Sequence, residues 1–293
     1  MKVTITGSLG NISKPLAAAL INAGHQVTVI SSHENKRAGI EALGANATIG
    51  SVNDVGFLTT AFTGADAVYT MVPNDFSVPD QKEYVTKVGN NYAEAIKASG
   101  VKKVVNLSSI GAHLADGTGP IKRLHIVENI LNRLEGIAVK HLRPGFFYIN
   151  FLGNIDMIKH MDILGSNYGG DTILSMVHPK DIAAAAAEEI QGDITGKSVR
   201  YVVSDERSAA EVASVLGKAI GKPDLKWVAF TDEQSLAGML QVGVPEEMAK
   251  DYVEMGNAAA SGILWEDYKK NKPSLAKTKL EDFAVEFAEK YKG

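Results

Sequence analysis

The chain has 293 residues, of which 45% are hydrophobic and 22% charged, so it is long enough to bury a sizeable core. Its formal net charge is −4, and the absence of a basic stripe or polybasic segment argues against nucleic acid or an anionic membrane as a direct partner. Cysteine is absent, which excludes disulfides, thiolate nucleophiles and cysteine-ligated metals and agrees with the cytoplasmic location that we expect.

Short apolar runs alternate with helical patterns through the first half of the chain. The expected strands cover 3–6, 26–30, 47–49, 67–72, 103–107 and 138–142. The expected helices cover 14–23, 36–43, 55–62, 81–98 and 124–133. Strands that alternate with helices are typical of βαβ units, so the sequence predicts an α/β fold with a doubly wound parallel Rossmann sheet.

The alternation becomes irregular after Pro144. We expect strands at 172–177 and 198–203, the second of which returns to the main sheet, and helices at 209–220, 232–240, 245–262 and 280–291. Thr278 and Glu281 have the spacing of a capping box for the last helix. These patterns predict a dinucleotide-binding domain over 1–150 and a smaller, mostly helical substrate-side domain over 151–293.

A glycine-rich loop connects the first strand to the first helix. Residues 6–13 read Thr-Gly-Ser-Leu-Gly-Asn-Ile-Ser. The first glycine permits a tight turn, the second lets the backbone approach a pyrophosphate, and Ser13 is a small residue at the third position. The alternative is a purely structural turn, but the strand before the loop and the helix after it favour cofactor binding. The expected cofactor-binding residues here are Gly7, Ser8, Leu9, Gly10, Asn11 and Ile12.

The end of the second strand indicates which dinucleotide is bound. An NAD site usually places an acid here to bind the ribose 2′-hydroxyl, but this strand ends in Ser31 and Ser32, with Lys36 and Arg37 following. Hydroxyls and cations suit a 2′-phosphate, so we expect these four residues to favour NADP. The nearby Glu34 leaves NAD as an alternative cofactor. Lys36 and Arg37 could instead be solvent-exposed residues at the start of a helix, without a role in binding.

The chain contains three short motifs, Thr6-Gly7-x-x-Gly10, Asn106-Leu-Ser-Ser109 and Leu142-Arg-Pro-Gly-Phe146. Together they resemble the NmrA-like family of atypical short-chain dehydrogenases/reductases. The resemblance implies a Rossmann fold that binds NAD(P). The resemblance does not identify the substrate, because the family includes NAD(P)H-dependent reductases of quinones and dyes as well as regulators that bind dinucleotide without turnover.

The usual short-chain dehydrogenase dyad is missing from its expected helix. That dyad is a tyrosine followed four residues later by a lysine, which lowers the phenol pKa for proton transfer. Residues 120–128 contain no tyrosine. The spacing occurs only at Tyr268 and Lys272, in a charged stretch that we interpret as a solvated surface.

The residues expected at the active-site mouth follow the ends of later strands, where ligands of doubly wound sheets bind. The cofactor-binding set continues with Met71, Val72, Pro73 and Ser108. The expected catalytic residues are Lys122 and His125, and the expected substrate pocket contains Phe146, Phe147 and Asn150. The alternatives are a solvated cation at Lys122 and an exposed helical pair of His125 with Glu128. The histidines show no metal-ligand spacing, so we expect no metal.

These features favour an NAD(P)H-dependent oxidoreductase that transfers hydride from NADPH to a small planar acceptor such as a quinone, an azo dye or a carbonyl compound. The missing tyrosine favours the alternative of a non-catalytic, NAD(P)-binding redox-sensing regulator. It also argues against a sugar-nucleotide epimerase, which uses the same dyad. A homodimer and a regulatory protein partner both stay open.

Overall fold

The computed structural model describes all residues, 1–293, and they form two compact units. Unit 1 contains Met1–Ser109, Arg123–Arg143 and Ile182–Arg200, whereas unit 2 contains Ile110–Lys122, Pro144–Asp181 and Tyr201–Gly293. The expected boundary at residue 150 therefore lies within the middle stretch of unit 2. None of the helices combines the length and the apolar character that crossing a membrane would require.

A seven-stranded sheet forms the centre of unit 1, in the order β10-β6-β5-β4-β1-β2-β3. The bounds are β1 Lys2–Ile5, β2 Gln26–Ser31, β3 Asn46–Ile49, β4 Ala67–Thr70, β5 Lys103–Leu107, β6 Ala138–Pro144 and β10 Lys197–Val202. The pairings from β6 through β3 are all parallel. This arrangement confirms the predicted doubly wound sheet, and the position of β10 beside β6 confirms that the late strand returns to it.

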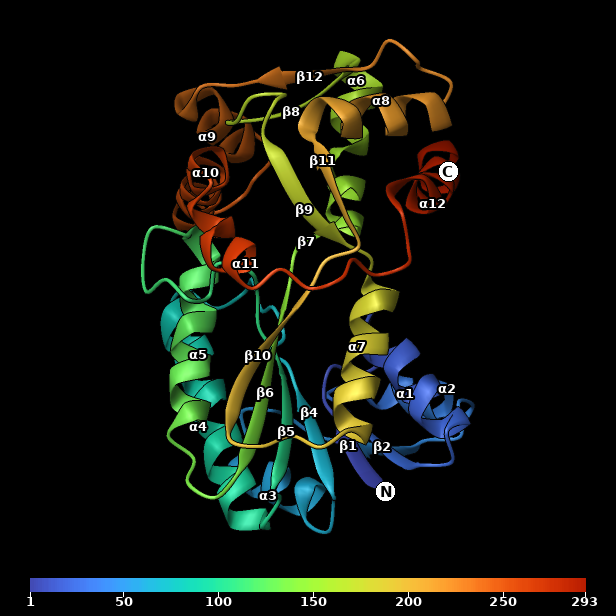
Figure 1. Ribbon diagram of the computed structural model, residues 1–293, viewed down its shortest axis with the longest axis vertical. Coiled ribbons are helices and arrows are strands. Elements are labelled where there is room, and N and C mark those ends of the chain that lie inside the picture. Colours follow the sequence, from blue (N-terminus) through green and yellow to red (C-terminus); the bar gives the residue numbers. More distant parts are fainter. The chain divides into compact units, whose positions relative to one another are not determined.

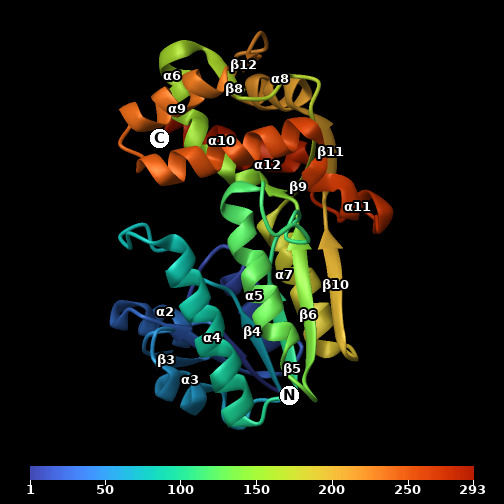
Figure 2. The ribbon, with the colours of Figure 1, turned by 90° about the vertical axis from the view of Figure 1, so that its left-hand side faces the viewer.

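Helices cover both faces of this sheet. The bounds are α1 Ser13–Asn22, α2 Arg37–Glu41, α3 Val55–Phe62, α4 Gln81–Ser99, α5 Lys122–Asn132 and α7 Pro179–Gln191, with a 3₁₀ turn at Glu34–Lys36. Helices α3, α4 and α5 lie on one face, and α1 and α7 lie on the other (Figures 1 and 2). The layer between α3, α4, α5 and the sheet contains four fully buried side chains, Phe62, Tyr92, Val104 and Leu131. Burial of such apolar side chains is the main source of stability for this layer.

Local sequence signals set the ends of two of these helices. Asp54 caps α3 by accepting a hydrogen bond from the Phe57 N–H at 3.0 Å. Asp80 caps α4 in the same way through the Glu83 N–H at 2.8 Å. Helix α4 ends at Ser99 and is followed by Gly100, whose φ of 79° is in the left-handed region that glycine adopts without strain.

Unit 2 combines two small sheets with helices. Its three-stranded sheet has the order β11-β9-β7, and β12 pairs with β8. The strands are β7 Phe146–Phe147, β8 Ile163–Ser166, β9 Ile173–Val177, β11 Asp205–Ser208 and β12 Lys226–Ala229. The helices are α6 Ile155–Met161, α8 Ala209–Ala219, α9 Asp232–Gln241, α10 Glu246–Ser261, α11 Glu266–Lys270 and α12 Leu280–Lys292, with 3₁₀ turns at Gly119–Ile121, Tyr148–Asn154 and Ile263–Trp265.

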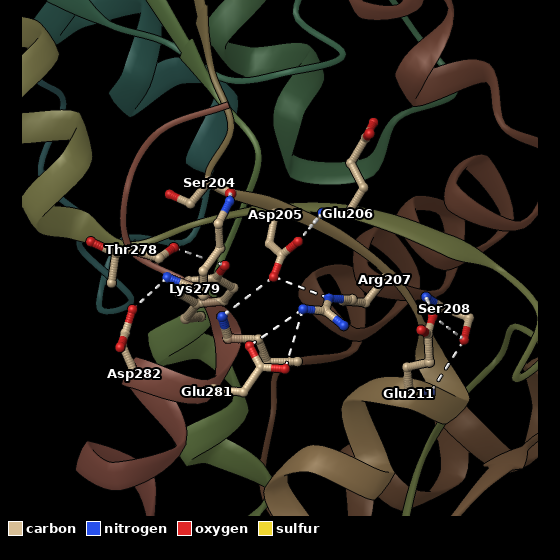
Figure 3. Close-up of polar contacts among 12 residues, drawn as sticks. Ser204, Asp205, Glu206, Arg207, Ser208, Glu211, Thr278, Lys279, Glu281 and Asp282 are labelled. Atoms are coloured by element: carbon tan, nitrogen blue, oxygen red, sulfur yellow. Dashed lines mark hydrogen bonds and ion pairs between the residues drawn. The ribbon is translucent and has the colours of Figure 1, made fainter. Parts of the chain in front are cut away.

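A network of charged side chains attaches the start of α12 to β11 (Figure 3). Asp205 accepts hydrogen bonds from the Arg207 guanidinium at 3.1 Å and from the Leu280 N–H at 3.5 Å. Arg207 also donates to Glu281 at 3.2 Å. Asp205 is buried, so its charge requires these partners. The C-terminal helix is thus fixed by side chains that lie more than seventy residues away along the chain.

Three local predictions are wrong in detail. The expected helix at 36–43 is a 3₁₀ turn followed by the five-residue α2. The strand expected to reach residue 72 ends at Thr70, because the Met71 N–H donates to the Thr6 hydroxyl instead of to a strand. Helix α12 is capped at Lys279 with Asp282 rather than by Thr278 and Glu281, and the Thr278 hydroxyl donates to Asp181 at 3.1 Å.

Candidate dinucleotide-binding site

The glycine loop after β1 has a conformation that requires its glycines. Gly7 has a φ of 92°, and a Cβ there would lie 2.5 Å from the Ser13 hydroxyl and 3.1 Å from Met71 Cγ. A Cβ at Gly10 would lie 3.0 Å from the Gly7 carbonyl oxygen. Gly7 is therefore restricted to glycine, whereas a side chain at Gly10 would make a tight contact with the backbone. The chain presents a bare backbone at this turn.

The loop leads into the N-terminus of α1, which no side chain caps. Outside the helix, the N–H groups of Asn11 and Ile12 have no acceptor within the protein. Ser13 donates its hydroxyl to the Thr6 carbonyl at 2.8 Å and so holds the start of the helix against the end of β1. Unpaired N–H groups and the positive end of a helix dipole together bind anions such as phosphate.

The loop residues predicted from the sequence thus lie together around one helix N-terminus. The Ser8 N–H donates to the Ile30 carbonyl at 3.0 Å, which ties the loop to β2. Leu9 packs toward α2, where a Cβ at Gly39 would lie 2.9 Å from Leu9 Cδ1. The exposed backbone at Gly10 and the two unpaired N–H groups that follow it match the negative charge of a dinucleotide pyrophosphate.

Met71 follows β4 and lies against the same loop. Its N–H donates to the Thr6 hydroxyl at 2.9 Å, and its carbonyl accepts a hydrogen bond from the Tyr92 hydroxyl at 2.6 Å. The structure therefore brings Met71 to Gly7, with Val72 and Pro73 next along the chain. Tyr92 was not among the residues predicted from the sequence, because a tyrosine inside a long amphipathic helix has no local signal for this contact.

The two serines at the end of β2 differ in their surroundings. Ser31 is buried, and its hydroxyl accepts hydrogen bonds from the Ser8 hydroxyl at 2.9 Å and from the His33 N–H at 3.2 Å. Ser32 is exposed. Ser31 thus links the glycine loop to the turn after β2, whereas Ser32 is accessible to a ligand. Their predicted role in cofactor binding stays a prediction.

The two cations after β2 also differ. Lys36 is exposed and forms no ion pair. Arg37 binds Glu34 through its Nε at 2.5 Å and donates to the Ala47 carbonyl at 3.3 Å. This pairing lowers the pKa of Glu34 and raises that of Arg37. A 2′-phosphate would compete with Glu34 for the Arg37 guanidinium and would meet Lys36 without such competition.

Ser108, at the end of β5, forms a buried cluster with Glu128 and Arg143. Its hydroxyl donates to Glu128 Oε1 at 2.5 Å, and Arg143 binds the same carboxylate at 2.9 and 2.6 Å. The alternative of an exposed pair between His125 and Glu128 is therefore wrong, because Glu128 is buried and holds two other partners. His125 is half-buried on α5.

Lys122 begins α5 and belongs to unit 2. Its ammonium group lies 2.9 Å from Glu254 and 3.3 Å from Asp251, both on α10. The hydrogen bond that Lys122 donates to Glu254 is the main reason that the pKa of Lys122 is raised, so the side chain stays charged at neutral pH. Glu254 also lines a groove of about 500 Å³ along α10. The catalytic role of Lys122 and His125 stays a prediction.

The three expected substrate-pocket residues lie in unit 2. Phe146 and Phe147 form β7 and are half-buried, and Asn150 is exposed in the 3₁₀ turn that follows. The Phe146 ring packs on Phe151 with 5.1 Å between ring centroids. Their assignment to a substrate pocket stays a prediction.

A second buried polar network, which sequence reasoning missed, crosses the sheet of unit 1. Thr70 donates to Asn106 at 3.0 Å, Asn106 donates to His141 Nδ1 at 3.1 Å, and His141 Nε2 donates to Asn132 at 3.0 Å. Burial lowers the pKa of His141 to about 4, so the imidazole is neutral. Polar residues within apolar strands are the one signal in the sequence for such a network.

The interpretation of Tyr268 and Lys272 as a solvated surface is wrong for the tyrosine. Tyr268 is completely buried, and its ring packs edge-on against Tyr201 with 5.6 Å between centroids. Lys272 binds Glu206 and lies 6.0 Å from the Tyr268 ring centroid. Desolvation raises the pKa of Tyr268, which makes it a poor proton donor or acceptor. No group of three or more histidine, aspartate or glutamate side chains is placed to hold a metal ion.

Comparisons with known proteins agree with this geometry. The NAD(P)H azoreductase of Xenophilus azovorans is 29% identical over 251 residues, which cover 84% of this chain and 83% of the azoreductase. An NADPH-dependent quinone oxidoreductase from Escherichia coli, solved with NADPH, has a TM-score of 0.83 at 22% identity, with 97% of this chain and 99% of that chain covered. The Citrobacter sp. triphenylmethane reductase, solved with NADP(H), has a TM-score of 0.81 at 20% identity, with 98% and 99% covered.

The family resemblance deduced from the motifs is also confirmed. A model of the NmrA-like family matches residues 1–284, which is nearly the whole chain. The glycine loop, the seven-stranded sheet and this match agree with one another, and the chain belongs to the NmrA-like family.

Proposed function

We propose that this protein is an NADPH-dependent reductase of small planar acceptors such as quinones and azo dyes. The observation that carries the proposal is the bare glycine loop at the uncapped N-terminus of α1, with the unpaired N–H groups of Asn11 and Ile12. The azoreductase and quinone oxidoreductase relatives support both the cofactor and the acceptor class. When bound, NADPH supplies the hydride.

The residues of unit 1 would divide the work of binding. The backbone of 10–12 would hold the pyrophosphate, as unpaired N–H groups at a helix N-terminus do. Ser32, Lys36 and Arg37 would bind the 2′-phosphate through a hydroxyl and two cations. Met71, which the Tyr92 and Thr6 side chains hold in place, would form an apolar wall beside the pyrophosphate.

The proposed reaction needs little from an enzymatic acid. A quinone accepts hydride directly, and the product anion takes its proton from solvent. Helix α5 contains no tyrosine, and Lys122 is held as a charged group by two carboxylates. Acceptors that can be reduced without a strong proton donor are therefore the class that fits, whereas simple ketones would be poor substrates.

The test is oxidation of NADPH by purified protein in the presence of a panel of quinones, azo dyes and aliphatic ketones. We expect loss of the nicotinamide absorbance with the quinones and dyes, slower turnover with NADH, and none with the ketones. Unchanged absorbance across the whole panel would contradict the proposal.

The missing tyrosine also motivates a second candidate function, a regulator that senses the redox state of the dinucleotide. Such a protein would bind NADP⁺ and NADPH with clearly different affinities and would leave all acceptors unreduced. Titration calorimetry with both forms separates the two candidates. Similar affinities together with turnover would reject the regulator.

A further inference from the structure

The cluster of Ser108, Glu128 and Arg143 in unit 1 fixes the direction in which the Ser108 hydroxyl hydrogen points. The three side chains come from the end of β5, from α5 and from the end of β6, and at most 7% of the surface of each residue is exposed. Glu128 receives the Arg143 guanidinium through Nε at 2.9 Å and Nη2 at 2.6 Å. A carboxylate in such a two-point ion pair is ionised and can only accept hydrogen bonds.

The hydroxyl of Ser108 is therefore oriented. It lies 2.5 Å from Glu128 Oε1, and its hydrogen must point at that oxygen because the carboxylate has none to give. The Ser108 N–H donates to the Leu142 carbonyl at 2.8 Å, which fixes the backbone as well. Nothing in the protein donates to Ser108 Oγ. The oxygen can therefore accept a hydrogen bond from a ligand and cannot donate one.

The position of Ser108 in the sheet indicates which part of the dinucleotide it faces. In this fold the adenosine half lies over β2, and the other half extends across the next strands on the opposite side of β1. Those strands are β4 and β5, which pair in register through Thr70 and Asn106. Ser108 follows β5 at its carboxyl end, two residues beyond Asn106, and so lies on the nicotinamide side of the sheet.

We propose that Ser108 Oγ accepts a hydrogen bond from an N–H or O–H group of the bound ligands, and that Glu128 is the positioning residue that enforces this role. The proposal rests on the proposed function. The donor is either the primary amide of the nicotinamide ring or a polar hydrogen on the planar acceptor. In both cases Ser108 selects ligands with a donor and cannot assist carbonyl reduction as an acid.

The first arm of the test concerns binding alone. Calorimetry would compare NADP⁺ with its 3-acetylpyridine analogue, in which a methyl group replaces the amide nitrogen. If the nicotinamide amide is the donor, the protein binds NADP⁺ about 5- to 10-fold more tightly, which is the effect of one hydrogen bond. Ser108→Ala should remove this difference.

The second arm concerns the acceptor. Steady-state turnover with NADPH would compare 2-amino- with 2-methyl-1,4-naphthoquinone, which differ in a donor at one position. If the quinone substrate supplies the hydrogen bond to Ser108, KM is about 5- to 10-fold lower for the amino compound. Ser108→Ala should then make the two KM values equal. A preference in one arm identifies the source of the hydrogen bond.

Three variants separate positioning from a general structural role. Ser175→Ala is the matched control, because Ser175 is also buried with its hydroxyl 3.4 Å from a glutamate, and it should leave both preferences unchanged. Ser108→Thr keeps the hydroxyl and should retain the preference. Glu128→Gln removes the obligate acceptor and should reduce it, and if that variant does not fold, the two Ser108 variants decide the question.

The outcomes are distinguishable from failure of the proposed function. Absence of NADP⁺ binding by the unmodified protein would overturn the proposed function and this inference together. Normal NADP⁺ binding without a donor preference in either arm would overturn this inference alone. A preference that survives in Ser108→Ala would also overturn it.

Discussion

The glycine loop of unit 1 and the charged network at the start of α12 in unit 2 are held by different kinds of interaction. The loop takes its shape from its glycines and from the local hydrogen bond between Ser13 and Thr6. Hydrogen bonds to Ile30 and Met71 then tie it to the ends of the neighbouring strands. The α12 network instead depends on Asp205 and Arg207 contacting residues 74 or 75 positions later in the chain. The proposed ligand site therefore depends mainly on backbone geometry, whereas attachment of the C-terminal helix depends on long-range charge pairing.

The largest expected effect comes from filling the loop. In Gly10→Val the new side chain would meet the Gly7 carbonyl and cover the backbone that a phosphate must approach. We expect NADP⁺ affinity to fall about 100-fold or more, which is roughly 3 kcal/mol, together with some loss of stability from the contact with the Gly7 carbonyl. Calorimetry measures the affinity.

Gly238→Ala is the control for the Gly10 variant, because that glycine has open space around it in α9. It should bind NADP⁺ normally. Normal binding by Gly10→Val as well would show that the backbone at this turn does not contact the cofactor.

The second largest expected effect concerns the charged network at the start of α12. Asp205→Asn removes the charge that Arg207 and the Leu280 N–H share. We expect a loss of about 2 to 3 kcal/mol in the free energy of unfolding, below the value for a completely buried pair because Arg207 is partly exposed. Urea unfolding measures this change. NADP⁺ affinity should stay within about twofold, and a large drop would mean that the two regions are energetically coupled.

His141 predicts how stability depends on pH. In the unfolded chain its pKa is near 6.5, whereas burial keeps it at about 4 in the folded protein. Below pH 6.5 the unfolded state therefore takes up a proton that the folded state does not, and stability falls as the pH falls. The expected loss from this residue is about 2 kcal/mol at pH 5. The nearby charges of Glu128, Arg143 and Lys197 modify the size of this effect and leave its sign unchanged.

Urea unfolding at pH 7 and pH 5 checks this prediction with a pair of variants. His141→Gln should be less stable at pH 7 but should lose much less stability between the two pH values. Gly238→Ala, which alters no titratable group, should keep the pH dependence of the unmodified protein. If the free energy of unfolding of His141→Gln falls between pH 7 and pH 5 as much as that of the unmodified protein, other groups cause the acid sensitivity.

The smallest expected effect concerns cofactor preference. Glu34 occupies the Arg37 guanidinium, and Glu34→Gln would weaken that pairing and release the cation for a 2′-phosphate. We expect the ratio of NADP⁺ to NAD⁺ affinity to rise about 3- to 5-fold at low salt, and less at high salt because exposed charges are screened. A lower ratio would indicate that Glu34 itself contributes to binding.

Elements that depend on local sequence signals could be predicted, whereas elements that depend on distant partners could not. The sheet, its flanking helices and the glycine loop follow from hydrophobic periodicity and from short motifs, so those predictions were confirmed to within a few residues. The strands of unit 2 were mostly missed. β7 has two residues and β8 and β12 have four each, and their partners lie far away in the chain.

The candidate site divides in the same way. The backbone groups around Gly7 and Gly10 could be predicted because the motif is local. The buried partner of Ser108 could not, because Glu128 lies on the following helix in a sequence context that is typical of a solvated surface. Tyr268 was misread for the same reason, since charged neighbours along a helix do not show which side of it packs against another element.

A single-turnover measurement tests the central claim most directly. Protein, one equivalent of NADPH and one equivalent of a naphthoquinone would be mixed without oxygen, and the nicotinamide absorbance would be followed to completion. A reductase predicts that NADPH and quinone disappear together in a 1:1 ratio, at a rate that Gly10→Val lowers strongly. Tight NADPH binding without any loss of absorbance would contradict the claim and favour a dinucleotide sensor.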